Sequence, residues 1–347
     1  MLNYAIVVAT RNRLSMLNTS LPLFLAQTRP PSRIVVVDRS DDHPPVRAYC
    51  QQLAATSDIP IEIVYGEAAN SSAQRNQGLA RVTEQVVAFP DDDSLWYPDT
   101  AAELLAVYEA DAEHRFGAVS ATESRYPPAG APLDRPPAQR SIKDDVRILR
   151  WRNRIENRLV PQPFNLYGTE KITELAPYAT ADGLSYPIVE TIGGYLMSFR
   201  TNVASALLFD GLLGSRIGYA THEDKDLGLR VLASGSLIAA APQALVFHNV
   251  APGKRANGFD YGFFHVLNYA YISQKVFPPG SRALASLPRY LRYKVFLYSL
   301  RRSDAYVRDI HRGAVAAFSG RDLIMSAPRS RLAEAYAEVC DRYRPRG

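Results

Sequence analysis

Three consecutive aspartates, Asp91, Asp92 and Asp93, follow Pro90 and the apolar run of residues 86–89. One aspartate after a strand is an ordinary turn former or helix cap, but a cap needs only one carboxylate. Three adjacent carboxylates repel one another, so the arrangement costs free energy unless a cation lies among them. Carboxylate oxygens, together with substrate phosphates, are the usual ligands of Mg²⁺ or Mn²⁺. The sequence therefore predicts a divalent-metal site here.

A second pair of acids, Glu223 and Asp224, stands in the stretch HEDKDLGLRVLASG of residues 222–235. The apolar residues that follow recur at helical spacing and Gly235 ends the pattern, so the pair lies near the start of a predicted helix. Ionised carboxylates are favoured there by the helix dipole, and first-turn acids are common for that reason alone. A carboxylate at such a place can also act as a general base.

Two further features combine unusual residue types with a strand end. Gly193 and Gly194 precede Tyr195, and paired glycines let the backbone approach a ligand closely, although they also form ordinary turns and bulges. His248 ends a strand-like run at residues 244–247. A lone histidine after a strand is most often a structural hydrogen-bonding group, so its spacing alone assigns it no role.

The elements that position these residues alternate in type along the first hundred residues. Continuous β-branched runs predict strands at 4–9, 34–37, 59–65 and 86–89. Helical patterns separate them, with an end or a kink predicted at Pro22 and a capping box predicted at Thr100 and Glu103. This order predicts an α/β fold, a doubly wound and mostly parallel sheet flanked by helices.

Ligands of such sheets bind beyond the carboxyl ends of the strands. Thr10 and Arg11, Asp38 and the three aspartates at 91–93 each follow a predicted strand directly. We therefore expect their side chains to meet in one crevice.

Composition limits the class of protein. The chain has 347 residues, is 47% hydrophobic and 22% charged, and carries a net charge of +5, as an ordinary globular protein does. Its two cysteines, Cys50 and Cys340, can form neither a disulfide framework nor a CxxC metal site, so a cytoplasmic location is expected. We expect neither a signal peptide nor a membrane-spanning segment.

Two regions mix basic and apolar residues. Residues 122–190 begin with a proline-rich excursion and continue with a predicted helix whose arginines share one face. From residue 252 onward the chain is rich in Tyr, Phe and Arg, which predicts amphipathic basic helices. Both patterns are typical of solvated helices, and both also suit contact with a membrane surface or an anionic lipid-linked acceptor. No nucleic-acid-binding motif is present, so no nucleic-acid partner is expected.

Six motifs in this order resemble the glycosyltransferase family 2 enzymes: VVATRNR, IVVVDRSDD, SSAQRNQGLA, FPDDDS and, further on, GGYLMSFR and HEDKDLGLRVLASG. The resemblance implies a GT-A fold with a DxD motif. It also implies a catalytic domain at 1–250, with a nucleotide-binding half at 1–120 and an acceptor-binding half at 121–250. A C-terminal helical subdomain is expected at 251–347.

The resemblance also implies roles for individual residues. Asp38 would receive the base or ribose, Asp91 and Asp92 would contact ribose and metal-bound water, and Asp93 would hold Mn²⁺ or Mg²⁺, with His248 as a further metal or phosphate ligand. Asp224 would be the general base and Glu223 its neighbour on the acceptor side, with the reverse assignment open. The remaining expected residues are Thr10, Arg11, Arg13 and Arg75 for the nucleotide sugar and Gly193, Gly194 and Tyr195 for the donor sugar or acceptor.

These roles together describe an inverting, metal-dependent glycosyltransferase. It would move a sugar from a UDP-, GDP- or dTDP-linked donor to a glycan or polyprenyl-diphosphate-linked acceptor, in bacterial surface polysaccharide or glycolipid synthesis. Two alternatives remain open from the sequence. One is a haloacid-dehalogenase-like phosphatase with Asp91 as nucleophile, because residues 91–95 also fit its DxDx[ST][LV] pattern. The other is a nucleotide-sugar- or carbohydrate-binding module without catalysis.

Overall fold

The computed structural model describes residues 1–131, 133, 164, 178–179, 185–216, 221–250, 256–300 and 304–344. The chain divides into two compact units, Met1–Pro137 with Tyr167–Pro252, and Ala138–Leu166 with Gly253–Gly347. The basic helical face predicted between residues 122 and 190 falls almost entirely outside the described residues.

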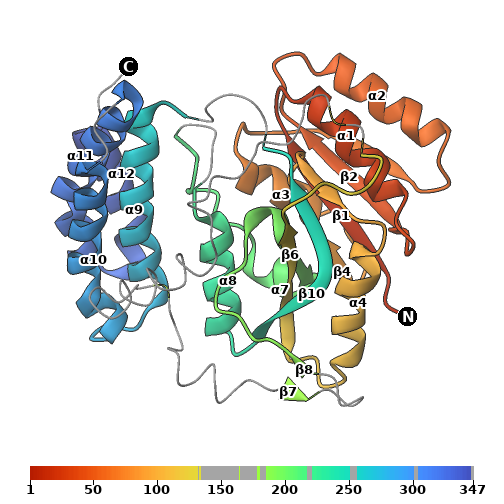
Figure 1. Cartoon of the computed structure of the whole chain (residues 1–347). Coiled ribbons are helices and arrows are strands. Elements are labelled where there is room, and N and C mark those ends of the chain that lie inside the picture. Colours follow the sequence, from red (N-terminus) through yellow and green to blue (C-terminus); the bar gives the residue numbers. More distant parts are fainter. Residues whose placement is uncertain are drawn as a thin grey trace. The chain divides into compact units, whose positions relative to one another are not determined.

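Unit 1 contains an eight-stranded sheet with the strand order β3-β2-β1-β4-β9-β6-β10-β5 (Figure 1). The strands are β1 (Tyr4–Thr10), β2 (Arg33–Asp38), β3 (Ile61–Tyr65), β4 (Val86–Ala88), β5 (Ser94–Trp96), β6 (Phe116–Ser124), β9 (Met197–Arg200) and β10 (Leu237–His248). β1 is parallel to β2 and β4, β2 to β3, and β6 to β10, whereas β9 and β5 are antiparallel to their neighbours. The sheet is therefore mostly parallel, as predicted. A separate two-stranded sheet joins β7 (Tyr178–Ala179) and β8 (Ser185–Tyr186).

Helices cover both faces of this sheet because the strands are apolar on both sides. Alternate residues of β1 pack in one core with α1 (Leu14–Leu25), α2 (Pro44–Ala55) and α4 (Thr100–Ala110). On the other face, Gly78 of α3 (Ser71–Leu79) lies directly over Val7 and Val37, and Val231 of α8 (Glu223–Ala233) lies against Gly117. A short helix, α7 (Thr201–Leu207), packs beside α3 and α8 (Figure 1).

Two local predictions need correction. Of the two outcomes predicted at Pro22, the helix end is wrong, because α1 continues to Leu25 and Ala26 N donates to Pro22 O at 3.0 Å. The capping box does not form, because Asp99 is the N-cap of α4 and the Thr100 hydroxyl instead donates to Leu245 O at 2.5 Å. A tertiary partner on β10 therefore takes the hydroxyl that the local motif would have used.

Unit 2 contains four long helices: α9 (Gly258–Val276), α10 (Arg282–Ser299), α11 (Ala305–Ser326) and α12 (Leu332–Tyr343). Glycines bring α9 and α11 into close contact, since a Cβ at Gly262 would lie 1.9 Å from Ile310 O and one at Gly313 would lie 1.9 Å from Phe259 O. No helix of the described residues is both long and apolar enough to cross a membrane.

Candidate active site

The predicted crevice lies at the carboxyl ends of β1 and β4. Thr10, the last residue of β1, donates its hydroxyl to Asp92 Oδ2 at 2.7 Å. Arg13 Nη1 donates to Asp92 Oδ1 at 3.0 Å and lies 3.4 Å from Asp93 Oδ2. Burial raises the pKa of Asp92, the Asp93 charge raises it further, and Arg13 and the Thr10 hydroxyl partly oppose the shift. Two of the three aspartates are thus deeply buried beside one another, with Arg13 as the cation that faces both.

Asp91, Asp93 and His248 form a cluster that fits a divalent metal ion. Each offers one ligand atom, and these atoms all lie within 4.8 Å of one another. Strand register sets this cluster, because His248 on β10 pairs with Ser94 on β5 and Asn249 N donates to Asp93 O at 2.9 Å. Two carboxylate oxygens and one imidazole nitrogen form a donor set that suits Mn²⁺. The structure thus brings together the two predicted metal ligands and adds Asp91.

The segment of Gly193, Gly194 and Tyr195 lies against both groups of acidic residues, the cluster with Asp91 and Asp93 and the pair of Glu223 and Asp224. The Tyr195 ring stacks on the His248 imidazole, with ring centroids 4.4 Å apart and planes at 21°. A Cβ at Gly194 would lie 3.8 Å from Asp224 Oδ2 and 3.9 Å from Arg75 Nη2. This contact of Tyr195 with His248 was not predicted from the sequence, in which Tyr195 was noted only because it follows two glycines.

Arg75 connects the two acid clusters. α3 buries one face, and on it the Arg75 side chain is nearly inaccessible. Its Nη2 donates to Asp91 Oδ1 at 2.7 Å and its Nη1 to Glu223 Oε1 at 2.8 Å. Burial alone would lower the pKa of Arg75, but the carboxylates of Asp91 and Glu223 raise it above its ordinary value. Arg75 is therefore a permanent cation between the cluster of Asp91, Asp93 and His248 and the acid pair of Glu223 and Asp224.

Glu223 and Asp224 open α8, as predicted. Asp224 is partly exposed, and its Oδ1 accepts a hydrogen bond from Lys225 N at 2.8 Å. Burial of the carboxyl group raises the pKa of Asp224 to about 6, and the Glu223 charge adds to that effect. Glu223 differs from Asp224 in its partner, because the Glu223 carboxylate forms an ion pair with Arg75. Of the two, Asp224 has the carboxyl group better placed to exchange a proton near neutral pH.

Two predicted nucleotide residues lie apart from this arrangement. The Asp38 carboxylate is fully buried and accepts from Ser40 N and Ser40 Oγ, at 2.9 and 2.5 Å, and its other oxygen lies 2.6 Å from His43 Nδ1. Arg11 lies 3.4 Å from Asp41 Oδ1 at an exposed position. Asp38 thus shapes the loop after β2, while Arg11 reaches the surface beside it.

An arginine–tyrosine pair also lies at the carboxyl ends of β2 and β3, with Arg39 half-buried and Tyr65 exposed. The Arg39 guanidinium is 4.7 Å from the centre of the Tyr65 ring and donates to its hydroxyl group. His43 meets the same ring edge-on at 4.9 Å. This cluster was not predicted from the sequence, although Tyr65 ends a predicted strand at the same end of the sheet as Asp38.

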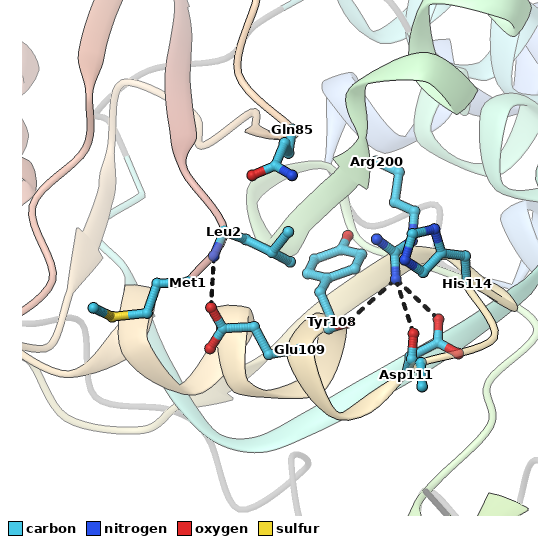
Figure 2. Close-up of a pocket in the computed structure, with 9 residues that line it drawn as sticks. Met1, Leu2, Gln85, Tyr108, Glu109, Asp111, His114 and Arg200 are labelled. Carbon is cyan, nitrogen blue, oxygen red and sulfur yellow. Dashed lines mark hydrogen bonds and ion pairs between the residues drawn. The ribbon is translucent and has the colours of Figure 1, made fainter. Parts of the chain in front are cut away.

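A cavity of about 440 Å³ lies at the other end of the strands, where β1 begins and β9 ends (Figure 2). At this cavity Glu109 is bound by Leu2 N and Arg29, and Arg200 is bound to Asp111. None of the predicted site residues lines it. The acid clusters therefore define the candidate site, and this cavity does not.

A mostly parallel sheet with helices on both faces and acidic residues after its fourth strand is the fold of the GT-A glycosyltransferases. Residues 5–154 match the family model described as glycosyl transferase family 2, so this part of the chain is a domain of that family. No curated protein sequence matches the chain. The family match also argues against the phosphatase alternative, because Asp91 lies within the region that matches the glycosyltransferase model.

Solved structures support the same fold. The mannosyltransferase PcManGT from Pyrobaculum calidifontis, in complex with GDP-Man and Mn²⁺, is 16% identical, with a TM-score of 0.52 over 99% of this chain and 88% of that one. A TarS fragment from S. aureus, in complex with UDP-GlcNAc, is 14% identical, with a TM-score of 0.54 over 99% of this chain and 91% of that one. At these identities the likeness establishes a shared fold.

Proposed function

We propose that the chain is a metal-dependent, inverting glycosyltransferase that transfers a sugar from a nucleotide-sugar donor to a hydroxyl group of an acceptor. The observation that carries this proposal is the pair of acid clusters joined by Arg75, with a metal-type donor set at one end and Asp224 at the other. Inversion needs a base on one side of the anomeric carbon and support for the leaving group on the other. Two related structures that hold GDP-Man with Mn²⁺ and UDP-GlcNAc support the choice of donor class.

Each end of the site has a distinct task in this proposal. Asp91, Asp93 and His248 would hold Mn²⁺ or Mg²⁺, which supplies positive charge to the departing diphosphate. Asp224 takes the proton from the acceptor hydroxyl as it attacks, and Glu223 lies beside it on the acceptor side. Gly193, Gly194 and Tyr195 line the space at the sugar, where the missing side chains of the glycines let substrate approach the backbone.

The nucleotide would lie over the carboxyl ends of β1, β2 and β3. Thr10, Arg13 and Asp92 shape the floor next to the metal cluster, and Arg11 contributes positive charge at the rim. Asp38 acts on the base or ribose in one of two ways. It acts through the loop that its carboxylate holds, or it contacts the ligand directly after one of its three hydrogen bonds is exchanged for a bond to the ligand. Arg75 supports the diphosphate end through Asp91.

The acceptor in this proposal is a glycan or a polyprenyl-diphosphate-linked oligosaccharide of bacterial surface polysaccharide synthesis. The location is the cytoplasm, at the inner face of the membrane. Free thiols at both cysteines agree with a reducing compartment.

A donor screen tests the proposal directly. The purified chain is incubated with UDP-, GDP- and dTDP-sugars and Mn²⁺, and binding is read by thermal shift and slow donor hydrolysis by release of the nucleoside diphosphate. With Mn²⁺ present, one donor class should raise the melting temperature and be hydrolysed. Asp93→Ala should abolish both the rise in melting temperature and the hydrolysis, whereas the control Asp42→Ala, at an exposed position, should retain both. Hydrolysis of p-nitrophenyl phosphate without use of any nucleotide sugar, or binding without hydrolysis or transfer, would contradict it.

A further inference from the structure

Helix α10 exposes one continuous stripe of basic and apolar side chains. Its members recur at intervals of three or four residues, which places them on one side of a helix. They are Arg282, Ala285, Arg289, Arg292, Phe296 and Leu300, the last being the C-cap residue. The opposite side holds the buried residues Leu287, Tyr290 and Leu291. The stripe is therefore the face that α10 turns away from the core of unit 2.

The apolar end of the stripe is unusually accessible. Phe296 is 55% exposed and Leu300 is 62% exposed, and they lie one helical turn apart. Single exposed apolar residues are ordinary on protein surfaces and need no explanation. An aromatic and an aliphatic side chain that adjoin three arginines on the same stripe form the pattern of a helix that lies in a membrane interface.

The stripe carries positive charge that its own helix does not balance. α10 contains four cationic residues and no acidic one. Arg282, Arg289 and Arg292 are exposed, and none of them forms an ion pair with another residue of the described part of unit 2. The fourth cation, Lys294, instead lies over the rings of Tyr269 and Tyr290, at 5.7 and 5.3 Å. Three arginines thus direct positive charge outward along one helix face.

Three acids of the other helices of unit 2 have partners of their own. Asp309 on α11 pairs with Arg312, Asp260 on α9 is held by Arg344, and Glu334 on α12 pairs with Arg331. In the described part of unit 2, none of these three carboxylates forms an ion pair with an arginine of α10. The surface is therefore complementary to a partner that is both anionic and able to accept apolar side chains.

We propose that the exposed face of α10 docks on the surface of an anionic phospholipid bilayer. Arg282, Arg289 and Arg292 contact lipid phosphates, and Phe296 and Leu300 enter the layer between head groups and acyl chains. The inference deepens the proposed function, on which its biological sense rests, because a membrane surface is where a lipid-linked acceptor is found. It concerns unit 2 alone and requires no particular arrangement of the two units.

Vesicle flotation of the full chain tests this proposal. We expect binding to vesicles of phosphatidylcholine with phosphatidylglycerol, little binding to phosphatidylcholine alone, and a loss of binding as salt is raised. One arginine near an anionic surface corresponds to about fivefold in affinity, so Arg289→Gln with Arg292→Gln should weaken binding about 25-fold. Phe296→Ser with Leu300→Ser should weaken it by at least tenfold, even though all charges remain.

The matched control removes the same charge from elsewhere in unit 2. Arg312→Gln with Arg331→Gln changes two exposed arginines on or beside other helices, and binding should fall far less than in the α10 variant. Equal losses in the two double variants would overturn the proposal, as would equal binding to both vesicle types. A concentration-dependent dimer that the Phe296→Ser, Leu300→Ser variant abolishes would overturn it too, by assigning the stripe to a second copy.

Donor hydrolysis measured without vesicles separates this proposal from the proposed function. All α10 variants should hydrolyse donor at the unaltered rate, because none of the changed residues belongs to unit 1. Hydrolysis without vesicle binding would refute the docking surface and leave the enzyme assignment intact. Vesicle binding without any use of nucleotide sugars would do the opposite.

Discussion

Replacing Asp224 with asparagine should stop sugar transfer and at the same time stabilise the folded chain. The asparagine keeps the size of the side chain and an oxygen that can accept the hydrogen bond from Lys225 N. It removes the negative charge beside Glu223 and the ability to take up a proton. General-base catalysis contributes about 10²- to 10⁴-fold, so transfer should fall by that factor while donor affinity stays the same.

The gain in stability follows from the pKa of Asp224. Folding raises it from 3.8 to about 6, so the folded chain holds this proton more tightly than the unfolded chain does. Ionisation of Asp224 therefore lowers the unfolding free energy. The loss is absent below pH 4 and complete above pH 6, where it is about 3 kcal/mol as an upper bound. Asparagine is uncharged throughout and escapes that cost.

Thermal melting at pH 4 and pH 8, together with a transfer assay, tests both effects. Asp224→Asn should melt several degrees above the wild type at pH 8 and at the same temperature at pH 4. The control, Asp226→Asn in the same helical turn, should lower the melting temperature, because Asp226 is fully buried and accepts from Arg230 at 2.9 and 2.6 Å. Normal transfer by Asp224→Asn would refute the base assignment, and a melting difference that ignores pH would refute the electrostatic reasoning.

Three further predictions concern the same structure. The value of kcat/KM for transfer should rise with pH through about 6, since Asp224 must be ionised to act, and the residual rate of Asp224→Asn should lack that rise; a flat wild-type profile from pH 5 to 8 would contradict the assignment. Arg75→Met should lower the unfolding free energy by about 3–5 kcal/mol, because Asp91 and Glu223 lose the cation they share; denaturant unfolding checks this, and Arg81→Met, at an exposed pair with Glu62, should cost far less. Gly313→Ala should destabilise unit 2 by several kcal/mol, because its Cβ would lie 1.9 Å from Phe259 O; Gly211→Ala, which has open space around it, should melt like the wild type.

Much of the catalytic end of the sheet could be predicted from the sequence. Apolar runs located four parallel strands, and the rule that ligands bind beyond their carboxyl ends brought Thr10 and Asp91–Asp93 to one place. Local signals failed where a distant segment decides the outcome. β9 is a short antiparallel strand in the middle of the sheet, and its four residues carry no pattern that sets it apart from a loop.

The roles of single side chains were harder to predict for the same reason. Arg75 was expected to contact the nucleotide sugar, but its partners, Asp91 and Glu223, come from two separate parts of the chain. Asp38 was expected to face the nucleotide, and its carboxylate is bound by Ser40 and His43 within its own loop. Residue type and strand end fix the neighbourhood of a side chain, whereas its hydrogen-bond partners depend on packing that one segment cannot reveal.

The bonds that define the site also determine when it can form during folding. Arg75 and Glu223 are separated by 148 positions, and Thr10 and Asp92 by 82. Contacts of this kind need large loops to close, so they are made late, after local helices have appeared. Until then the chain presents scattered carboxylates that no metal ion can use together. In the proposed metal-dependent enzyme, affinity for a divalent metal ion should therefore be acquired in a late kinetic step of refolding, and it should mark molecules in which the sheet is complete.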